Sequence, residues 1–182
     1  MHRGRPMAVA VATVFAMAGF AVPATAGAAT APSATPAANA SIITQLKHLP
    51  GVTYLGKNPN APTGYQVYEL EIRQPVNHHQ RHGATFEQHL ELYQRNVTAP
   101  MVMYLSGYFN YTFLSPKDVY LSDATTIVKG NQISVEHRFY GDSVPHPARW
   151  KYLTVWQEAA DEHHVVQVFK KLYHAPLLVS GL

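Results

Sequence analysis

Two kinds of apolar pattern follow one another along this chain, and they constrain its fold more than any other feature. Apolar residues take every second place at 68–73, and Phe86, Leu90 and Leu92 repeat the pattern among polar neighbours. Such alternation is typical of antiparallel strands with one packed face and one wet face. Residues 101–105 and 177–179 are apolar without alternation. Unbroken apolar runs of this length are expected of strands that are covered on both faces.

The order of these runs predicts an α/β fold. The two alternating strands are expected to form an antiparallel pair joined by the loop at 74–84. After strand 101–105 come a short strand that ends at Val135, an amphipathic helix and strand 177–179. A strand–helix–strand order is typical of a mostly parallel sheet with a crossover helix. We therefore expect an antiparallel pair followed by parallel strands.

Two helices are predicted from capping residues and spacing. Ser41 can cap a short helix that Pro50 and Gly51 end. Thr154 can cap a longer one, with Gln157 three residues later completing a capping box. One of two mid-helix histidines, His163 or His164, is expected to face the core. The apolar face of this helix is predicted to comprise Trp156, Ala159, Ala160, Val166, Phe169 and Tyr173.

The first residues have the pattern of a secretory signal peptide. His2, Arg3 and Arg5 form a positive start, an apolar run of about 16 residues follows, and small residues end the segment at Ala26. The run is shorter than the roughly 20 residues that span a bilayer. We expect residues 1–26 to be cleaved, and 27–40, rich in Ala, Pro and Thr, to be a flexible segment before a domain at 41–182.

Composition excludes several function classes. Without Arg3 and Arg5, the chain has 12 of its 14 lysines and arginines and 11 acidic residues, so its net charge is close to zero. No basic stripe remains for a nucleic acid, and no membrane partner is expected after signal cleavage. Cysteine is absent, so neither a disulfide framework nor a thiolate metal site can form. Nothing in the chain calls for a cofactor.

Candidate site residues lie where strands are expected to end. Glu136, His137 and Arg138 follow the strand that Gly130 and Asn131 begin, and three ionisable groups there indicate a paired structural network or the rim of a site. Gly107 follows a buried strand, where it forms either a tight turn or a backbone N–H facing a ligand.

The loop at 74–84 contains three histidines, His78, His79 and His82. Histidines this close could bind a metal, but no carboxylate lies among them, and Pro75 and Gly83 break the segment. We predict a solvated loop and no metal.

The chain resembles the secreted bacterial tripeptidyl/prolyl aminopeptidase family of serine peptidases. The similar stretches are the run from Gly130 to Pro145, Leu-Thr-Val-Trp-Gln-Glu-Ala-Ala-Asp at 153–161, and Leu-Val-Ser-Gly at 178–181. The Glu-His-Arg-Phe-Tyr-Gly-Asp-Ser segment is also similar to the related prolyl carboxypeptidases. The resemblance implies an α/β-hydrolase that is secreted and extracellular, and that removes short peptides, often proline-containing, from peptide N-termini.

The resemblance also implies roles for single residues. Gly107 and Tyr108 stand where the fold places an oxyanion donor, and Glu136, His137 and Arg138 would support the site from below. Ser106 replaces an acidic residue that could bind the substrate amine. Gly181 and Leu182 match the first two places of the Gly-x-Ser-x-Gly elbow, so the nucleophile is expected directly after Leu182. His137 is not the catalytic base on this interpretation.

No catalytic triad residue is therefore expected in this chain, which we interpret as an N-terminal part of the catalytic domain, truncated before the nucleophile elbow and inactive alone. Two other hypotheses remain open. One is a secreted binding or structural module that needs no nucleophile, and the other is a metal-dependent enzyme that uses His78, His79 and His82.

Overall fold

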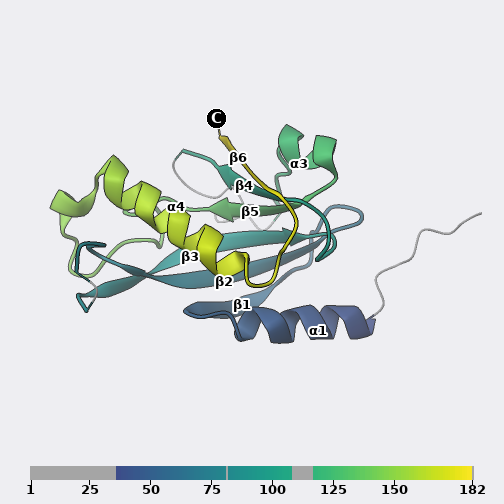
Figure 1. Ribbon diagram of the computed structural model, residues 1–182, viewed down its shortest axis with the longest axis horizontal. Helices are drawn as coiled ribbons and strands as arrows, with labels where there is room; N and C mark the ends of the chain where they lie inside the picture. Colours follow the sequence, from purple (N-terminus) through teal and green to yellow (C-terminus); the bar gives the residue numbers. More distant parts are fainter. Residues whose placement is uncertain (1–35, 81, 108–116, 182) are drawn as a thin grey trace, which may run out of the picture. The chain divides into compact units, whose positions relative to one another are not determined.

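A six-stranded sheet forms the centre of the protein. The computed structural model describes residues 36–80, 82–107 and 117–181; the predicted signal peptide lies outside them. Figure 1 shows α4 crossing the sheet and α1 beside β1. In chain order the elements are α1 (Pro36–Lys47), β1 (Val52–Asn58), β2 (Gln66–Pro75), β3 (Thr85–Gln94), β4 (Met101–Leu105), α3 (Asp123–Val128), β5 (Asn131–Val135), the 3-10 helix η1 (Trp150–Tyr152), α4 (Val155–Phe169) and β6 (Leu177–Gly181).

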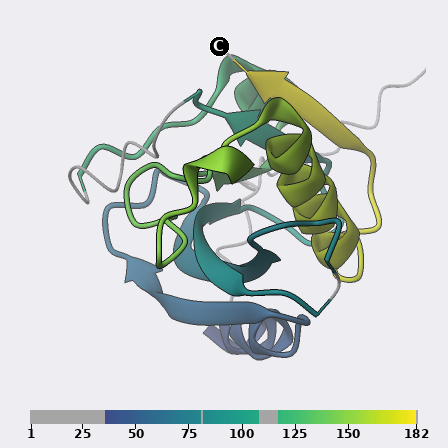
Figure 2. The same ribbon diagram turned by 90° about the vertical axis from the view of Figure 1, so that its left-hand side faces the viewer.

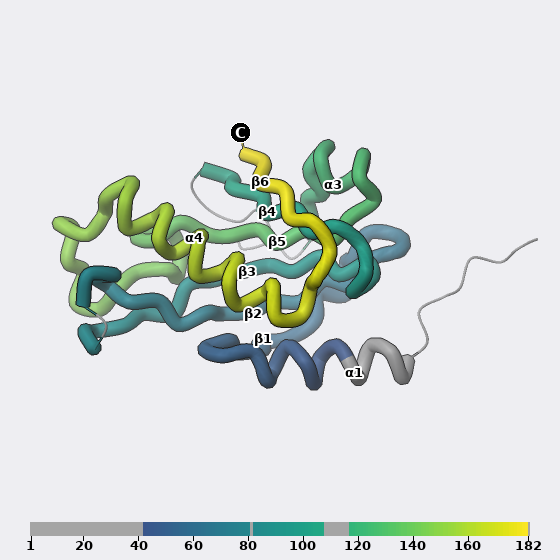
Figure 3. The backbone as a smooth tube through the Cα atoms, in the orientation of Figure 1, coloured from purple at the N-terminus to yellow at the C-terminus, as the bar shows by residue number. Residues whose placement is uncertain are grey.

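The strand directions change once across the sheet. The spatial order is β1-β2-β3-β5-β4-β6, which the tube in Figure 3 follows. Neighbours from β1 to β5 are antiparallel, whereas β4 is parallel to both β5 and β6. The predicted α/β class, with antiparallel strands followed by parallel strands and a crossover helix, is confirmed.

One face of the sheet carries the main core. The apolar residues of the alternating strands, such as Leu70 and Leu90, point to this face and are fully buried. Leu46 of α1 and Val165 and Phe169 of α4 pack against it. Figure 2, turned by 90°, shows these two helices at different places along the curved sheet. The core therefore joins the antiparallel strands to the crossover helix.

The opposite face of β3 is buried, so the prediction of a wet face on this strand is wrong. Glu91 is 1% exposed, and Tyr93 packs with Tyr65 and Val67. The segment before α3 covers this face, since the Tyr120 N–H donates to Tyr93 Oη over 3.0 Å. Polar alternation on β3 thus marks a buried polar layer.

The long helix begins as predicted but buries a different face. The Thr154 side chain accepts a hydrogen bond from the Gln157 N–H, which confirms the cap. The buried residues are Gln157, Asp161, Val165, Val168 and Phe169, whereas Trp156 is 51% exposed. The predicted face was wrong because two polar residues lie on the packed side, where they bind partners described below.

Both ends of the chain differ from expectation. Helix α1 begins at Pro36, before the predicted cap at Ser41, so 36–40 is helical rather than flexible. Strand β6 was expected to be covered on both faces. It pairs with β4 at the sheet edge, and Leu178 and Val179 are 44% and 61% exposed. Within the described residues, no helix is long and apolar enough to cross a membrane.

The turn into β5 generates a test of the fold. A Cβ added at Gly130 would lie 2.7 Å from the Pro100 carbonyl oxygen. Because backbone must shift to relieve this overlap, Gly130→Ala is expected to lower the free energy of unfolding by about 1–3 kcal/mol in urea titrations. Gly56→Ala is the matched control, since a Cβ there meets nothing within 4 Å. Equal stabilities for the two variants would contradict the packing described for Gly130.

Candidate functional site

Arg138, directly beyond the end of β5, is the centre of a buried polar network. Its guanidinium is 0% exposed and makes a fork with Asp161 of α4, Nε–Oδ2 at 2.6 Å and Nη2–Oδ1 at 2.8 Å. The remaining donors reach the carbonyl oxygens of Pro75, Val76 and Tyr152. A bidentate pair with its other donors satisfied is the arrangement in which a buried charge is tolerated. The predicted structural ion network is confirmed for Arg138.

Asp161 also fixes the loop between β2 and β3. His78 Nε2 lies 2.6 Å from Asp161 Oδ1, and the Gln157 side chain accepts from the His78 N–H and donates to Asn77. His79 stacks on Trp156 with ring centroids 4.0 Å apart. The expectation of a solvated loop is thus wrong for His78, which is half-buried and paired, while His82 is exposed. The three histidines have different surroundings and do not form one site.

Glu136 is held by the turn that follows the strand. It is 0% exposed, and its Oε2 accepts from the Ser143 hydroxyl over 2.8 Å. Gly141 has φ +49°, and a Cβ there would collide with Glu136 Oε1. The glycine of the Tyr-Gly-Asp-Ser run is therefore required both for its backbone conformation and for space beside the carboxylate.

His137 points away from this network toward α4. Its Nδ1 lies 2.9 Å from Glu158 Oε1, and both side chains are partly buried. The hydrogen bond to Glu158 raises the pKa of His137, although burial opposes this effect. Burial raises the pKa of Glu162, and the nearby charge of Glu158 adds to the increase. His137 therefore pairs with Glu158, and its role in the site stays a prediction.

A cavity lies at the carboxyl edge of the parallel strands, and its wall includes His137, Arg138 and Glu158. Its volume is about 440 Å³. The acidic and imidazole groups His137, Glu158 and Glu162 are on one side, and Gly107 is also part of the wall. Among the described residues, the lining consists of Gly107, His137, Arg138, Tyr140, Leu153, Thr154, Val155, Glu158, Ala159 and Glu162. Strand carboxyl ends at such an edge are where α/β sheets form their sites.

Gly107 and Gly181 lie at neighbouring strand ends. Gly181 pairs with Leu105, and a Cβ on Gly181 would be 3.4 Å from the Leu105 carbonyl oxygen. Gly107 comes two residues after Leu105. Its φ is +85°, a left-handed conformation that favours glycine. The structure therefore brings the two predicted glycines to one edge, while Tyr108 and Leu182 lie outside the described residues.

Sequence reasoning missed the acidic residues of α4. Asp161 is the partner of Arg138, and Glu158 and Glu162 face the cavity. Their positions at i, i+3 and i+4 place them on one side of the helix, which was a usable signal. A second signal was the Glu-His-Arg run at the end of the preceding strand, because its charged side chains need partners of opposite charge.

In the part of the chain that the structure describes, two groups of side chains have ligand atoms close enough to hold a metal ion. One is His137, Glu158 and Glu162 in the cavity. The other is Glu69, His89 and Glu91 on the far face of the sheet. In each group the ligand atoms lie within 4.8 Å of one another.

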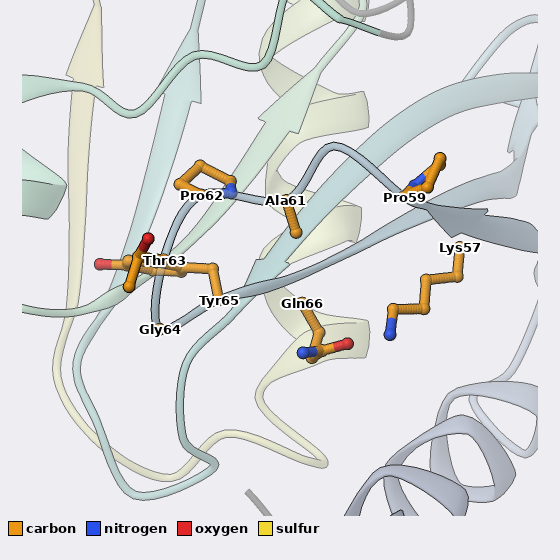
Figure 4. Close-up of a pocket in the computed structure, with 8 residues that line it drawn as sticks. All are labelled: Lys57, Pro59, Ala61, Pro62, Thr63, Gly64, Tyr65 and Gln66. Carbon is orange, nitrogen blue, oxygen red and sulfur yellow. The ribbon is translucent and has the colours of Figure 1, made fainter. Parts of the chain in front are cut away.

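A second cavity, of about 540 Å³, lies at the connection between β1 and β2. Figure 4 shows its lining residues, among them Lys57, Pro62 and Tyr65, around this turn. Its walls are mainly proline, glycine and small side chains. It lacks the convergence of ionisable groups found beside Gly107 and is not a candidate for chemistry.

The family model of PS-10 peptidase S37 matches residues 34–181. The chain belongs to this family. It is 37% identical over 157 residues to the prolyl tri/tetrapeptidyl aminopeptidase of Streptomyces mobaraensis, a match that covers 86% of this chain and 31% of that protein. The chain thus spans about a third of the length of this relative.

A solved structure also resembles the chain at low similarity. It is a protein from Bacteroides fragilis assigned as an acetyl xylan esterase, with a TM-score of 0.48 and 14% identity over 78% of this chain and 44% of that one.

The buried pair generates a stability prediction. Asp161→Ala leaves the Arg138 guanidinium buried without its counter-charge, so the free energy of unfolding is expected to fall by about 3–5 kcal/mol. Glu87→Ala is the control, because it removes the partner of Arg73 from an ion pair whose side chains are 63% and 38% exposed. That loss is expected to stay within about 1 kcal/mol. Similar losses in both variants, measured by urea unfolding, would contradict the central role of Arg138.

The raised pKa of His137 generates a pH prediction. A pKa that is higher in the folded state adds stability that is fully present below the ordinary value of about 6.5 and is lost as the pH rises through the folded value. His137→Gln should therefore cost more stability at pH 5.5 than at pH 8.5, measured as unfolding free energy. The matched control is His82→Gln in the exposed loop. Equal effects of His137→Gln at both pH values would show that the ion pair with Glu158 contributes nothing.

Proposed function

We propose that this chain forms the oxyanion side and floor of a secreted serine-type aminopeptidase that cleaves short, proline-containing peptides from peptide N-termini. Family membership supports peptidase chemistry, and the aminopeptidase of Streptomyces mobaraensis supports a peptide substrate. Residues 1–26, with their signal-peptide pattern, support secretion. Catalysis would proceed through an acyl-enzyme.

The observation that carries this proposal is the placement of Gly107 beside the end of β6. A nucleophile presented on a sharp turn after β6 would stand next to the backbone after β4. A backbone N–H at Gly107 or Tyr108 could then donate to the oxygen that becomes negative during acyl transfer. The cavity beside Gly107 gives room for the substrate.

On this proposal, the nucleophile is not among the serines of the described residues. Ser143 is the one serine two places after a glycine in the sequence, and it lacks the second glycine of the elbow motif. It is 0% exposed and donates its hydroxyl proton to Glu136. The nucleophile would follow Leu182, at the turn after β6.

The proposal predicts the outcome of a peptidase assay. The 182-residue chain is expected to show no turnover of an X-Y-Pro reporter peptide, because it presents no activated nucleophile. A chain extended by the residues encoded after Leu182 is expected to cleave the reporter and to be blocked by a serine-directed fluorophosphonate. A reporter with an acetylated N-terminus is the control, since an aminopeptidase must reject it.

Fluorophosphonate-sensitive turnover by the 182-residue chain would contradict the predicted position of the nucleophile. A folded, inactive extended chain would instead favour the alternative of a secreted binding or structural module. Thermal unfolding of both chains separates lack of activity from lack of folding.

A further inference from the structure

The far face of β2 and β3 carries an ionisable cluster that the peptidase site does not use. Glu69 and Glu91 are directly opposite each other in the antiparallel register, and His89 is two residues from Glu91 on the same face. His89 Nε2 lies 3.1 Å from Glu69 Oε2. The ligand atoms of all three side chains are within 4.8 Å of one another. This cluster brings two carboxylates and one imidazole to one point.

Burial makes this arrangement costly. Glu91 is 1% exposed, and like-charged carboxylates on directly opposed strand residues destabilise a sheet. Its Oε2 accepts from the Tyr93 hydroxyl over 3.0 Å, but its Oε1 has no hydrogen-bond partner within the described residues. Native structures rarely leave a buried carboxylate oxygen unsatisfied, so this atom needs an explanation.

The electrostatics of the cluster agree with this cost. Burial raises the pKa of Glu91 to about 8, and the charges of Glu69 and Glu136 add to the increase. Glu136, the residue directly after β5, is itself fully buried, and its backbone N–H donates to the His89 carbonyl. Three carboxyl groups thus surround the imidazole of His89.

We propose that Glu69, His89 and Glu91 bind a divalent first-row cation of the Mn²⁺ or Zn²⁺ type. Imidazole and carboxylate are ligands that these ions accept in proteins. An ion about 2.1 Å from each ligand atom holds two such atoms at most about 4.2 Å apart. The separations of up to 4.8 Å therefore need only small side-chain rotations.

The cluster is also reachable from solvent. The side chains of His89 and Glu69 are 10% and 24% exposed, so an ion can enter from this side while Glu91 binds it from below. The bound ion would cross-link β2 to β3 and supply the partner that Glu91 Oε1 lacks.

The cavity group is the second candidate for a metal. Its Glu158 already binds His137 through one oxygen and the Arg138 N–H through the other. Glu69 of the far-face cluster also has both oxygens in use, with His89 and, over 3.4 Å, with the Asn58 side chain, whereas in the cavity group one of the two contacts is to the backbone. An ion in the cavity would have to displace the contact that orders the strand end. Glu162→Gln is therefore a matched control for the cluster on the far face.

Mn²⁺ binding to the 182-residue chain tests the proposal. Equilibrium dialysis, with the free ion measured by its electron paramagnetic resonance signal, is expected to show one bound Mn²⁺ per folded chain. Glu91→Gln keeps the shape of the side chain and removes the carboxylate that would bind the ion, so folding is retained, as circular dichroism can verify. It should lower the Mn²⁺ affinity at least about tenfold, the loss that removal of even an outer partner typically causes. His89→Gln should do the same, and Glu162→Gln should bind as the wild type does.

Thermal unfolding gives a second readout. Mn²⁺ should raise the melting temperature of the wild type and of Glu162→Gln, but not that of Glu91→Gln. A folded wild-type chain that binds no Mn²⁺ would overturn the proposal. So would a loss of binding in Glu162→Gln with none in Glu91→Gln, because the ion would then occupy the cavity. Neither result bears on the peptidase assay, which follows a different site.

Discussion

The ion pair between Arg138 and Asp161 is the interaction on which the rest of the site depends. It joins the end of β5 to the middle of α4, and the other donors of Arg138 hold the end of β2 and the segment before α4. Taking both charges out of water has a large desolvation cost, which is offset only while every donor is satisfied. The position of α4 against the sheet is therefore fixed by polar geometry as well as by apolar packing. His137, next to Arg138, and Glu158, one turn before Asp161 on α4, line the cavity as a result.

Much of the fold could be predicted because the apolar patterns have clear periods. The change from alternating to unbroken runs placed the antiparallel and parallel strands, and the Thr154 cap placed the start of α4. The prediction was wrong where polar residues are buried. On α4 the packed stripe contains Gln157 and Asp161, so a rule that equates polarity with exposure chose the wrong face. On β3 the same rule placed the core face correctly but missed that the face with Glu91 is also buried. Only the partners, which are distant in sequence, explain these positions.

In the candidate site, too, some features could be predicted from the sequence and others could not. Gly107, Gly181 and the Glu-His-Arg run could be identified from their places at strand ends, because topology alone brings parallel strand ends together. The separate roles of Glu136, His137 and Arg138 could not be predicted from the sequence. Glu136 turns to the Tyr-Gly-Asp-Ser turn, His137 to the cavity and Arg138 to the interior, although the three are consecutive. The side-chain directions depend on the irregular backbone after β5, where Phe139 has φ +68°.

The fork between Arg138 and Asp161 also limits how this sequence can change over time. A guanidinium with five donors, all enclosed, has no isosteric substitute that keeps its contacts, since lysine offers a single point of charge. Replacing either residue alone leaves a bare charge inside the protein, whereas replacing both by apolar residues of similar volume can preserve stability. If the two residues are replaced one at a time, the single variant in between has an unpaired buried charge and a lower free energy of unfolding. Descendants of this chain are therefore expected to keep both residues or to lose them together.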